Sequence, residues 1–273
     1  MTILETICTN KRLEVEAQKS ATPLPLLKRL ITQHERAKIS FKAALQQSAT
    51  GIIAEFKRRS PSKGEIHPNA NVAEIVSGYE AAGAAAISVL TDEQFFGGSI
   101  TDFQTARSTI SKIPLLRKDF IVDEYQIFQS CAIGADVILL IAACLTKEEV
   151  ARFATVAHEL GMEALLEIHN ADELSYILPT VDVVGINNRD LKTFTTDIRH
   201  TIELANQLPA GYVKISESGL SDPQTVIQLR QAGFQGFLMG ETFMKTDHPP
   251  QALRRFMADL GCTTSRTELR RKA

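Results

Sequence analysis

The length, composition and charge of this chain exclude several classes of protein. Of its 273 residues, 44% are hydrophobic and 23% are charged, and the formal net charge is only −2. This balance is typical of a folded globular protein and argues against nucleic acid as the main partner. No run of about 18 apolar residues is present, so the sequence predicts no membrane span. The polar start of the chain contains no signal-peptide core, and we expect a cytoplasmic protein.

The cysteines and histidines do not form a recognisable metal site. Cys8, Cys131, Cys144 and Cys262 are scattered without a CxxC pair, which predicts free thiols in a reducing compartment. The histidines show neither HxH nor HExxH spacing. We therefore expect no metal, and no motif in the sequence demands an organic cofactor.

The first 48 residues precede any predicted strand. Ile3, Ile7, Leu13 and Val15 indicate a helix with its charges on the other face. Two further helices are expected, over residues 24–34 and 41–47. A linker, a dimerisation arm or a cap over one end of the domain would each fit. We favour the cap, because apolar positions run through the segment and no Gly/Ser linker follows it.

From residue 51 to residue 262 the sequence alternates between strand and helix patterns. Strands are predicted over 52–56, 85–90, 115–118, 137–141, 164–168, 183–186, 213–216 and 236–239. Helices are predicted over 72–82, 101–111, 124–133, 147–160, 171–178, 197–207, 223–231 and 251–260. This alternation predicts one (β/α)₈ barrel with an N-terminal helical extension. A doubly wound open sheet is less favoured because GxGxxG is absent. The polar, basic tail over 263–273 is expected to fray.

The first predicted strand ends in charged residues and runs into a basic loop. Glu55 and Lys57 lie two apart and share a face, and such a pair is costly to bury unless it is used. A surface ion pair on an edge strand is the plain alternative. The loop over 58–64 is basic and contains glycine, so we predict a lid that moves. Its residues suited to holding an anion are Arg58, Arg59, Ser60 and Lys63.

Other predicted strands also end in polar residues. In this fold the active site lies at the carboxyl ends of the strands. A single charge at such an end is more often solvated than catalytic, but several at equivalent ends are hard to explain as a solvated rim. Near an apolar wall the pKa of a glutamate rises and that of a lysine falls, which suits both to proton transfer. The inward-facing set comprises Glu55, Lys57, Lys118, Glu167, Asn187 and Glu217. His169 is predicted at the rim or just behind the residues that contact substrate, rather than as a catalytic residue.

The loops after the seventh and eighth strands predict a phosphate site. In this fold these loops often bind phosphate, and glycine lets the backbone approach an anion. Ser60 and Arg59 of the first loop are expected to close the site. The side chain of Glu241 is expected to point away, because a phosphate site would not choose a carboxylate. The loop residues concerned are Ser218, Gly219, Gly240 and Glu241.

Seven segments, in order, resemble indole-3-glycerol-phosphate synthase, and the resemblance extends to about residue 260. They are IAEFKRRSPSKG, SVLTDEQFFGG, LLRKDFIVDEYQI, LLEIHN, GINNRDL, ISESGL and FLMGETFM. The resemblance implies a (β/α)₈ barrel with an N-terminal helical extension and no cofactor. The implied reaction converts 1-(2-carboxyphenylamino)-1-deoxyribulose 5-phosphate to indole-3-glycerol phosphate in tryptophan biosynthesis, with loss of carbon dioxide and water.

The same resemblance implies roles for individual residues. Lys118 would be the general acid for ring closure, Lys57 would bind the anthranilate carboxylate, and Glu167 would be the base or acid for dehydration. The division of proton transfers between the two lysines stays open. Glu55 and Glu217 would orient the lysines and substrate hydroxyls, and Asn187 would hold a polar group. The implied binding residues are Ser60, Gly219, Gly240 and the Glu241 backbone for phosphate, Phe96 and Leu191 for the ring, and Arg59 (where Lys is common), Arg189 and Ser218.

Two other functions were weighed for the same barrel. A phosphoribosylanthranilate isomerase would need a Cys/Asp acid–base pair at the ends of strands one and four, where strand one offers Glu55 and Lys57. A non-catalytic phosphosugar-binding barrel would tolerate loss of Lys118 or Glu167. The expected partner is a small phosphosugar, without nucleic acid or membrane. The sequence leaves open whether the protein is a monomer or a weak homodimer.

Overall fold

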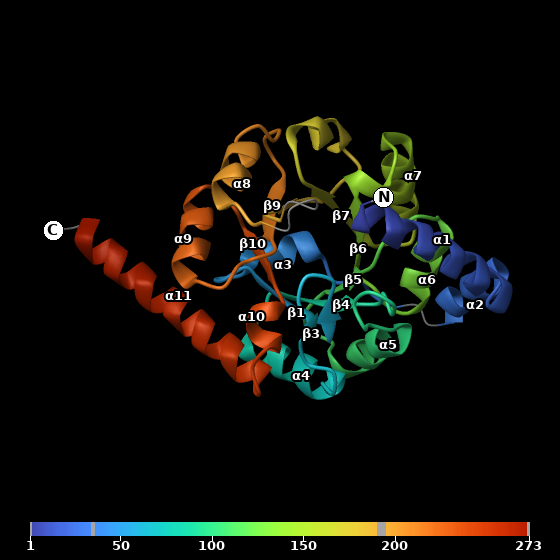
Figure 1. Cartoon of the computed structure of the whole chain (residues 1–273), viewed down its shortest axis with the longest axis horizontal. Coiled ribbons are helices and arrows are strands. Elements are labelled where there is room, and N and C mark those ends of the chain that lie inside the picture. Colours follow the sequence, from blue (N-terminus) through green and yellow to red (C-terminus); the bar gives the residue numbers. More distant parts are fainter. Residues whose placement is uncertain (1, 34–35, 190–194, 272–273) are drawn as a thin grey trace.

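The computed structural model describes the backbone of residues 2–33, 36–189 and 195–271, and side chains as far as residue 261. These residues form a closed barrel of eight parallel strands, with helices around it (Figure 1). Each strand pairs with its neighbour in the chain, and the last returns to the first through Ile53 opposite Leu238. The strands are β1 (Ile52–Phe56), β4 (Ala86–Leu90), β5 (Leu115–Lys118), β6 (Val137–Ile141), β7 (Glu163–Ile168), β8 (Val183–Asn187), β9 (Val213–Glu217) and β10 (Gly236–Met239).

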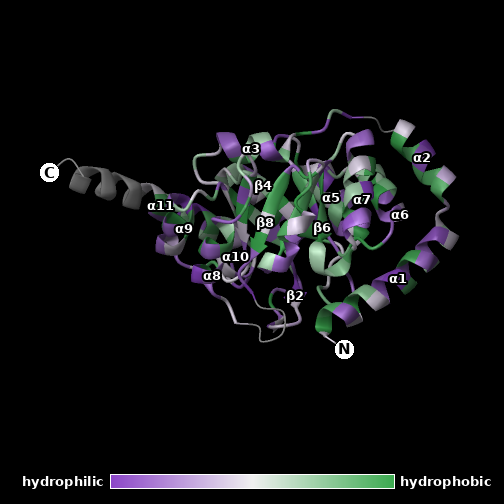
Figure 2. Ribbon diagram, turned by 90° about the horizontal axis from the view of Figure 1, so that it is seen from above, coloured by the Kyte–Doolittle hydropathy of each residue, from purple (hydrophilic) through white to green (hydrophobic). Residues whose placement is uncertain are grey.

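The barrel confirms the predicted fold class, and the strand bounds agree with the prediction to within one residue. The barrel strands are buried on both faces, which is why they read as nearly continuous apolar runs rather than as an alternation. Helices cover the outer face and other side chains fill the interior. Figure 2 shows this arrangement, with hydrophobic colour on central strands and hydrophilic colour on the outer helices.

The helices that follow the strands begin and end where the sequence indicates. Asn71 caps the first turn of α4, and Gly83 ends that helix in the left-handed conformation, which glycine adopts without strain. Thr146 and Glu149 form a capping box on α7. These helices are α4 (Val72–Ala82), α5 (Ile100–Thr109), α6 (Tyr125–Ala132), α7 (Lys147–Glu159), α8 (Ile198–Ala205), α9 (Pro223–Gln231) and α10 (Glu241–Met244).

Three predicted segments differ from the structure. The helix expected over 171–178 is a 3₁₀ helix, η2 (Ala171–Tyr176), and another 3₁₀ turn, η1 (Ala142–Cys144), follows β6. The tail expected to fray is helical, because α11 runs over Pro249–Arg271 and projects away from the barrel (Figure 1). The basic loop after β1 contains a small antiparallel hairpin. Its strands are β2 (Arg59–Ser60) and β3 (Gly64–Glu65).

The N-terminal extension contains the three predicted helices, and it reaches both ends of the barrel rather than one. They are α1 (Ile3–Ala21), α2 (Leu24–Gln33) and α3 (Phe41–Gln47). Phe41 and Leu45 of α3 are fully buried and pack into the barrel interior with inward side chains such as Ile53 and Leu165. Helix α2 packs on α6 outside the barrel. Ile3 and Ile7 of α1 instead line the cavity at the carboxyl ends of the strands.

The buried face of α1 differs from the predicted one at two positions. Leu13 was expected on the apolar face, yet it is 69% exposed. Lys11 takes the inward position between Ile7 and Val15 and is only 3% exposed. Positions 7, 11 and 15 follow the four-residue spacing of one helix face, so the stripe was present but contains a lysine. No described helix is long and apolar enough to cross a membrane.

Candidate active site

A cavity of about 510 Å³ opens at the carboxyl ends of the barrel strands. Every barrel strand contributes to its wall, as alternation along parallel strands requires. The floor is apolar, with Leu139, Ile141 and Leu238, and charged side chains stand above it. The predicted site residues in the wall are Glu55, Lys57, Ser60, Phe96, Lys118, Glu167, Asn187, Arg189, Glu217, Ser218, Gly219, Gly240 and Glu241.

Lys118, the last residue of β5, lies between two buried carboxylates. Its Nζ atom is 2.9 Å from Glu167 Oε2 and 3.3 Å from Glu217 Oε2. The amide of Asn187 donates to the other oxygen of Glu167 at 3.0 Å. The other oxygen of Glu217, Oε1, is buried and has no hydrogen-bond partner in the described structure. The four predicted residues from β5, β7, β8 and β9 therefore meet at one point.

The second pair, Glu55 and Lys57, comes from the end of β1. Lys57 Nζ is 2.8 Å from Glu55 Oε1, and Ser88 of β4 donates to Glu55 Oε2 at 3.4 Å. Glu55 is 3% exposed, so the pair is not the surface ion pair of the plain alternative. A Cβ atom at Gly240 would come within 2.6 Å of Glu55 Oε1. The glycine at the end of β10 thus leaves room for this carboxylate.

The charges within the cluster separate the pKa values of its members. Burial alone would lower the pKa of Lys118, but Glu167, Glu217 and Glu55 raise it. Burial would raise the pKa of Glu167, yet Lys118 and hydrogen bonds from neighbours lower it. For Glu217, burial raises the pKa to about 7, because Lys118 only partly offsets burial and the two other carboxylates. At neutral pH the cluster holds a protonated lysine, an ionised glutamate and a glutamate ready to gain or lose a proton.

One end of the cavity has the backbone and side chains suited to a phosphate. Ser218 and Gly219 both have positive φ angles, 71° and 68°, at the turn after β9. Ser60 lies with its hydroxyl 3.5 Å from that of Ser62, and Arg189 donates to the Ser62 hydroxyl at 2.8 Å. Lys63 Nζ is 3.6 Å from the Glu241 carboxylate. Cations and hydroxyls from two separate loops therefore surround this end.

Similarity to known proteins decides between the possible chemistries. The family model for indole-3-glycerol phosphate synthase matches residues 4–256. The chain belongs to the indole-3-glycerol phosphate synthase family. It is 54% identical over 255 residues to the indole-3-glycerol phosphate synthase of Bacteroides thetaiotaomicron, covering 93% of this chain and 97% of that one. The Salinibacter ruber enzyme of the same name is 41% identical over 260 residues, covering 95% and 96%.

Solved structures at low sequence identity support the fold alone. Thiamine phosphate pyrophosphorylase from Pyrococcus furiosus matches with a TM-score of 0.60 at 12% identity, covering 81% of this chain and 98% of that one. The tryptophan synthase α subunit of Legionella pneumophila matches with a TM-score of 0.56 at 13% identity, covering 81% and 96%.

Membership of the indole-3-glycerol phosphate synthase family assigns the chain to the carboxy-lyases of tryptophan biosynthesis.

One described residue of the predicted binding set, Arg59, is not among those that line the cavity of this family member. The Arg59 guanidinium donates to the backbone carbonyl of Glu93 at 2.7 Å and to that of Gln94, so it holds the loop after β4 instead of facing the cavity. Its role in substrate binding stays a prediction. Leu191 lies outside the described residues. The predicted aromatic contact, Phe96, lines the cavity, with its ring centre 5.8 Å from that of Phe120.

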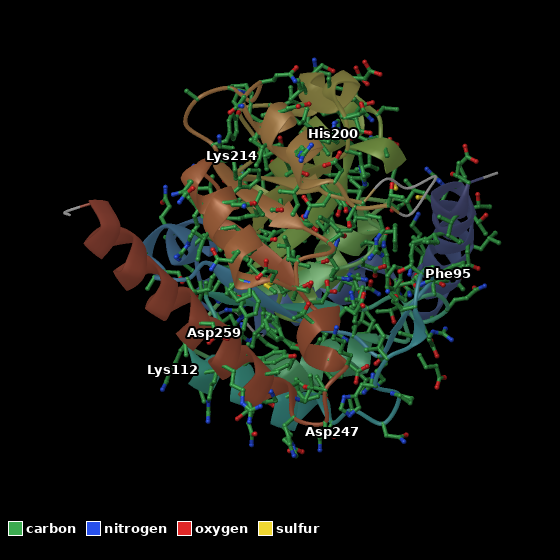
Figure 3. The ribbon with its side chains drawn as sticks, turned by 60° about the vertical axis from the view of Figure 1, so that its left-hand side comes forward. Phe95, Lys112, His200, Lys214, Asp247 and Asp259 are labelled. Atoms are coloured by element: carbon green, nitrogen blue, oxygen red, sulfur yellow. The ribbon has the colours of Figure 1, made fainter. Side chains whose placement is uncertain are left out.

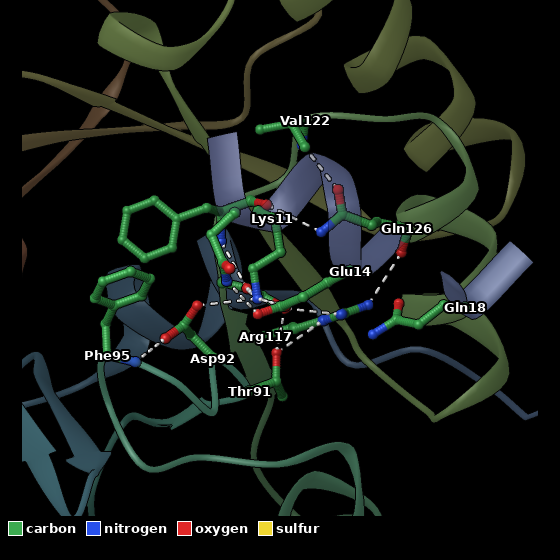
Figure 4. A network of polar contacts seen from close by, with 12 residues as sticks. Lys11, Glu14, Gln18, Thr91, Asp92, Phe95, Arg117, Val122 and Gln126 are labelled. Atoms are coloured by element: carbon green, nitrogen blue, oxygen red, sulfur yellow. Dashed lines mark hydrogen bonds and ion pairs between the residues drawn. The ribbon is translucent and has the colours of Figure 1, made fainter. Parts of the chain in front are cut away.

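A buried ion-pair cluster that was not predicted lies next to Lys118 in the chain, and Figure 4 shows its network of polar contacts. Lys11 Nζ lies 3.0 Å from Asp92 and 3.1 Å from Asp119, which follow β4 and β5. Arg117 pairs with Asp119 at 2.8 Å, on the helix-facing side of β5. We name Lys11, Asp92, Arg117 and Asp119 the anchor cluster. It fixes α1 against the two loops that flank Lys118, and the apolar spacing around Lys11 was its one signal in the sequence.

His169 is the residue for which the sequence left two positions open. Of the two predicted positions, the structure fits the one behind the substrate-contacting residues, because the side chain is 10% exposed and its Nε2 atom lies 3.1 Å from Glu167. It follows Glu167 by two positions, so the strand alternation could have placed both on one face. Among the described residues, no group of three or more His, Cys, Asp or Glu side chains could hold a metal ion.

Proposed function

We propose that this cavity closes the indole ring of 1-(2-carboxyphenylamino)-1-deoxyribulose 5-phosphate, with Lys118 as the general acid. The observation that supports this role most directly is the position of Lys118, protonated between Glu167 and Glu217 over an apolar floor. Ring closure needs a proton donor at the ketose carbonyl while the arene carbon attacks it. A lysine held by two carboxylates can deliver that proton into a site from which bulk water is largely excluded.

The cavity has groups suited to each end of this substrate. The phosphate belongs at the end formed by Ser60, Gly219 and Gly240, where backbone N–H groups and hydroxyls are available. The anthranilate carboxylate belongs near Lys57, and the aromatic ring belongs against Phe96. Holding both ends brings the arene carbon and the ketose carbonyl together, which converts much of the binding energy into proximity.

The protonation states of the cluster fit the three parts of the reaction. In the first, a carbon–carbon bond forms and the carbonyl oxygen takes a proton from Lys118. In the second, carbon dioxide leaves, and the electrons of its bond restore the aromatic ring. In the third, the new hydroxyl takes a proton and leaves as water, while a base removes a proton from the ring being formed. Glu167 is ionised at neutral pH, and we therefore assign it the role of base.

The test mixes purified protein with the carboxyphenylamino-deoxyribulose phosphate and follows indole fluorescence, with a Lys118→Ala variant alongside. We expect indole formation by the wild type and a loss of about 10²–10⁴-fold in the variant. Calorimetric titration of the substrate into the variant should still show binding. Substantial turnover by the variant would overturn the role of Lys118. Binding without turnover by the wild type would leave only a phosphosugar-binding barrel.

We also propose the setting in which the reaction takes place. A cytoplasmic protein that binds only a small phosphosugar, and works as a monomer or weak homodimer, is supported by its modest net charge and scattered thiols. Light scattering at two protein concentrations tests the oligomeric state. A mass that stays at the tetramer value on dilution would contradict the proposal.

A further inference from the structure

His169 and Glu173 extend the catalytic cluster beyond Glu167. His169 Nε2 lies 3.1 Å from Glu167 Oε1, and its Nδ1 lies 3.5 Å from Glu173 Oε2. On the other side of Glu167, Oε2 is 2.9 Å from Lys118. The side chains of Glu167 and Glu173 are 5% and 12% exposed, so this row of charges is largely shielded from water. The row runs from η2 at the edge of the cavity to the general acid at its centre.

The turn after β7 holds this imidazole in place from several directions. Glu173 Oε2 accepts the backbone N–H of His169 at 2.6 Å, and Glu173 Oε1 accepts from Asn170 at 3.1 Å. Asn170 itself caps η2 by accepting from the backbone N–H of Asp172. From α8, the ring of His200, labelled in Figure 3, lies 3.2 Å from the carbonyl oxygen of His169. The Glu173 carboxylate is thus held by two hydrogen bonds, one on each oxygen, besides its contact with the ring.

We propose that His169, supported by Glu173, is a positioning residue that keeps Glu167 ionised and oriented toward Lys118 during the reaction. This proposal rests on the proposed role of Glu167 as the base. A protonated ring places a second cation against Glu167, on the side away from Lys118, and the ring never needs to touch the substrate. Without it, Glu167 would be held by Lys118 and the neutral amide of Asn187 alone.

The charge balance of the cavity supports a protonated ring. The carboxylates that face the cluster are Glu167 from β7, Glu217 from β9 and Glu55 from β1, against Lys118 from β5 and Lys57 after β1. Glu173 adds another carboxylate from η2. Burial alone would lower the pKa of His169, but Glu167 and Glu173 raise it to about 10. The imidazolium therefore persists through the neutral range and offsets one of the excess carboxylates.

The experiment compares the pH dependence of kcat in the wild type with that in His169→Gln, whose amide can still donate to Glu167 but has no charge. Loss of the cation should raise the pKa of Glu167. We expect the acidic limb of the profile to move up by about one pH unit, and kcat at neutral pH to fall about tenfold, with KM changing less. The variant Glu173→Gln should move the limb in the same direction by a smaller amount.

A matched control is available at the other end of the barrel. His158 pairs with Asp182 at 2.8 Å but does not line the cavity, so His158→Gln should leave the profile unchanged. A uniform fall in kcat without a shift of the limb would show that His169 is merely structural. An unchanged profile would overturn the proposal outright.

A second measurement keeps the proposal testable if His169→Gln fails to fold. An NMR titration of the wild-type histidine ring signals should show His169 still protonated at pH 8. The spectrum of His158→Gln lacks the His158 signal, which identifies that signal and excludes it. A ring that is neutral at pH 7.5 would overturn the proposal. This titration needs no turnover, so its result is separate from the fate of the proposed reaction, which fails only if the wild type makes no indole.

Discussion

Two buried ion-pair clusters lie side by side at the mouth of the barrel, and they differ in how completely their charges are matched. In the anchor cluster, both oxygens of Asp119 and both oxygens of Asp92 have a donor or cation within about 3 Å. Asp92 Oδ2 has no hydrogen bond but faces the Lys11 ammonium at 3.0 Å, whereas Glu217 Oε1 in the catalytic cluster has, among the described residues, neither a hydrogen-bond partner nor a paired cation. Lys118 and Asp119 are adjacent in the chain, yet they belong to different clusters.

The difference teaches what distinguishes a structural from a catalytic buried lysine. Lys11 also contacts Glu14 at 2.6 Å, but Glu14 is partly exposed to water, and the two fully buried carboxylates, Asp92 and Asp119, face two cations, Lys11 and Arg117. Lys118 instead lies among carboxylates in excess, and the surplus raises the pKa of Glu217 to about 7. A fully matched cluster stabilises the fold, whereas an unmatched one retains a proton that can be moved near neutral pH.

The largest expected effect is that of Lys118→Met on turnover. The substitution removes the general acid, so indole formation should fall by about 10²–10⁴-fold. The loss of stability should be smaller than is usual when a buried ion pair is broken, because Glu217 can take up a proton when Lys118 is gone. Fluorescence assays and urea denaturation of the same preparation measure both quantities. A variant that loses several kcal/mol of stability but keeps its turnover would reverse the roles of the clusters.

The matching substitution in the anchor cluster, Lys11→Met, should have the opposite effect. It leaves Asp92 and Asp119 buried without their shared cation, and breaking such a pair costs about 3–5 kcal/mol. Urea denaturation measures this loss. Turnover per folded molecule at low temperature should fall far less than in Lys118→Met. Equal losses of turnover in the two variants would show that the anchor cluster takes part in the chemistry.

The contrast between the clusters also marks how far the sequence could predict this molecule. The barrel was predictable because each strand is a local apolar run and each helix has local caps, such as Asn71 and Thr146. The catalytic cluster was predictable because its members occupy the same place at the ends of different strands. Lys118, Glu167 and Glu217 needed only the rule that inward side chains of a barrel converge.

The rest depended on contacts that local patterns do not contain. Lys11 is buried only because Asp92 and Asp119 approach it from two distant loops. The sequence alone therefore shows an amphipathic helix with an unexplained lysine in its apolar stripe. Arg59 belongs to a basic loop, but its direction follows from backbone carbonyls after β4. The segment over 171–178 has a helical composition, and composition does not separate a 3₁₀ helix from an α-helix. Lys214 precedes the inward-facing Ile215 on β9, and its amine lies 3.4 Å from the Ala205 carbonyl of α8, on the outer face of the barrel (Figure 3).

A smaller effect should appear in the pH dependence of stability. The folded pKa of Glu217, about 7, lies above its ordinary value of 4.5, because burial disfavours the anion. The folded protein therefore holds a proton that the unfolded chain releases, and stability falls as the pH rises through this window. Glu217→Gln cannot ionise, so at pH 8 it should be more stable than the wild type by roughly 1–3 kcal/mol, and the gain should vanish near pH 4.5. Denaturation curves at both pH values check this, and a variant less stable at pH 8 would contradict it.

The smallest effect concerns the space that leaves Glu217 unmatched. Gly185 on β8 does not have a positive φ angle, so its backbone does not require glycine. A Cβ atom there would nevertheless overlap Glu217 Oε1, and it would lie 3.3 Å from side-chain atoms of Ile215 and Leu165. Gly185→Ala should therefore turn the carboxylate away from its place beside Lys118 and reduce kcat by about tenfold.

Gly261→Ala is the matched control, because a Cβ atom at that position of α11 would meet no atom of the described residues within 4 Å. The control should leave kcat unchanged. If Gly185→Ala also leaves kcat and the pH profile unchanged, the position of Glu217 does not depend on this gap. The unpartnered oxygen would then be tolerated by the reaction instead of being required for it, and the contrast between the two clusters would rest on Lys118 and Glu167 alone.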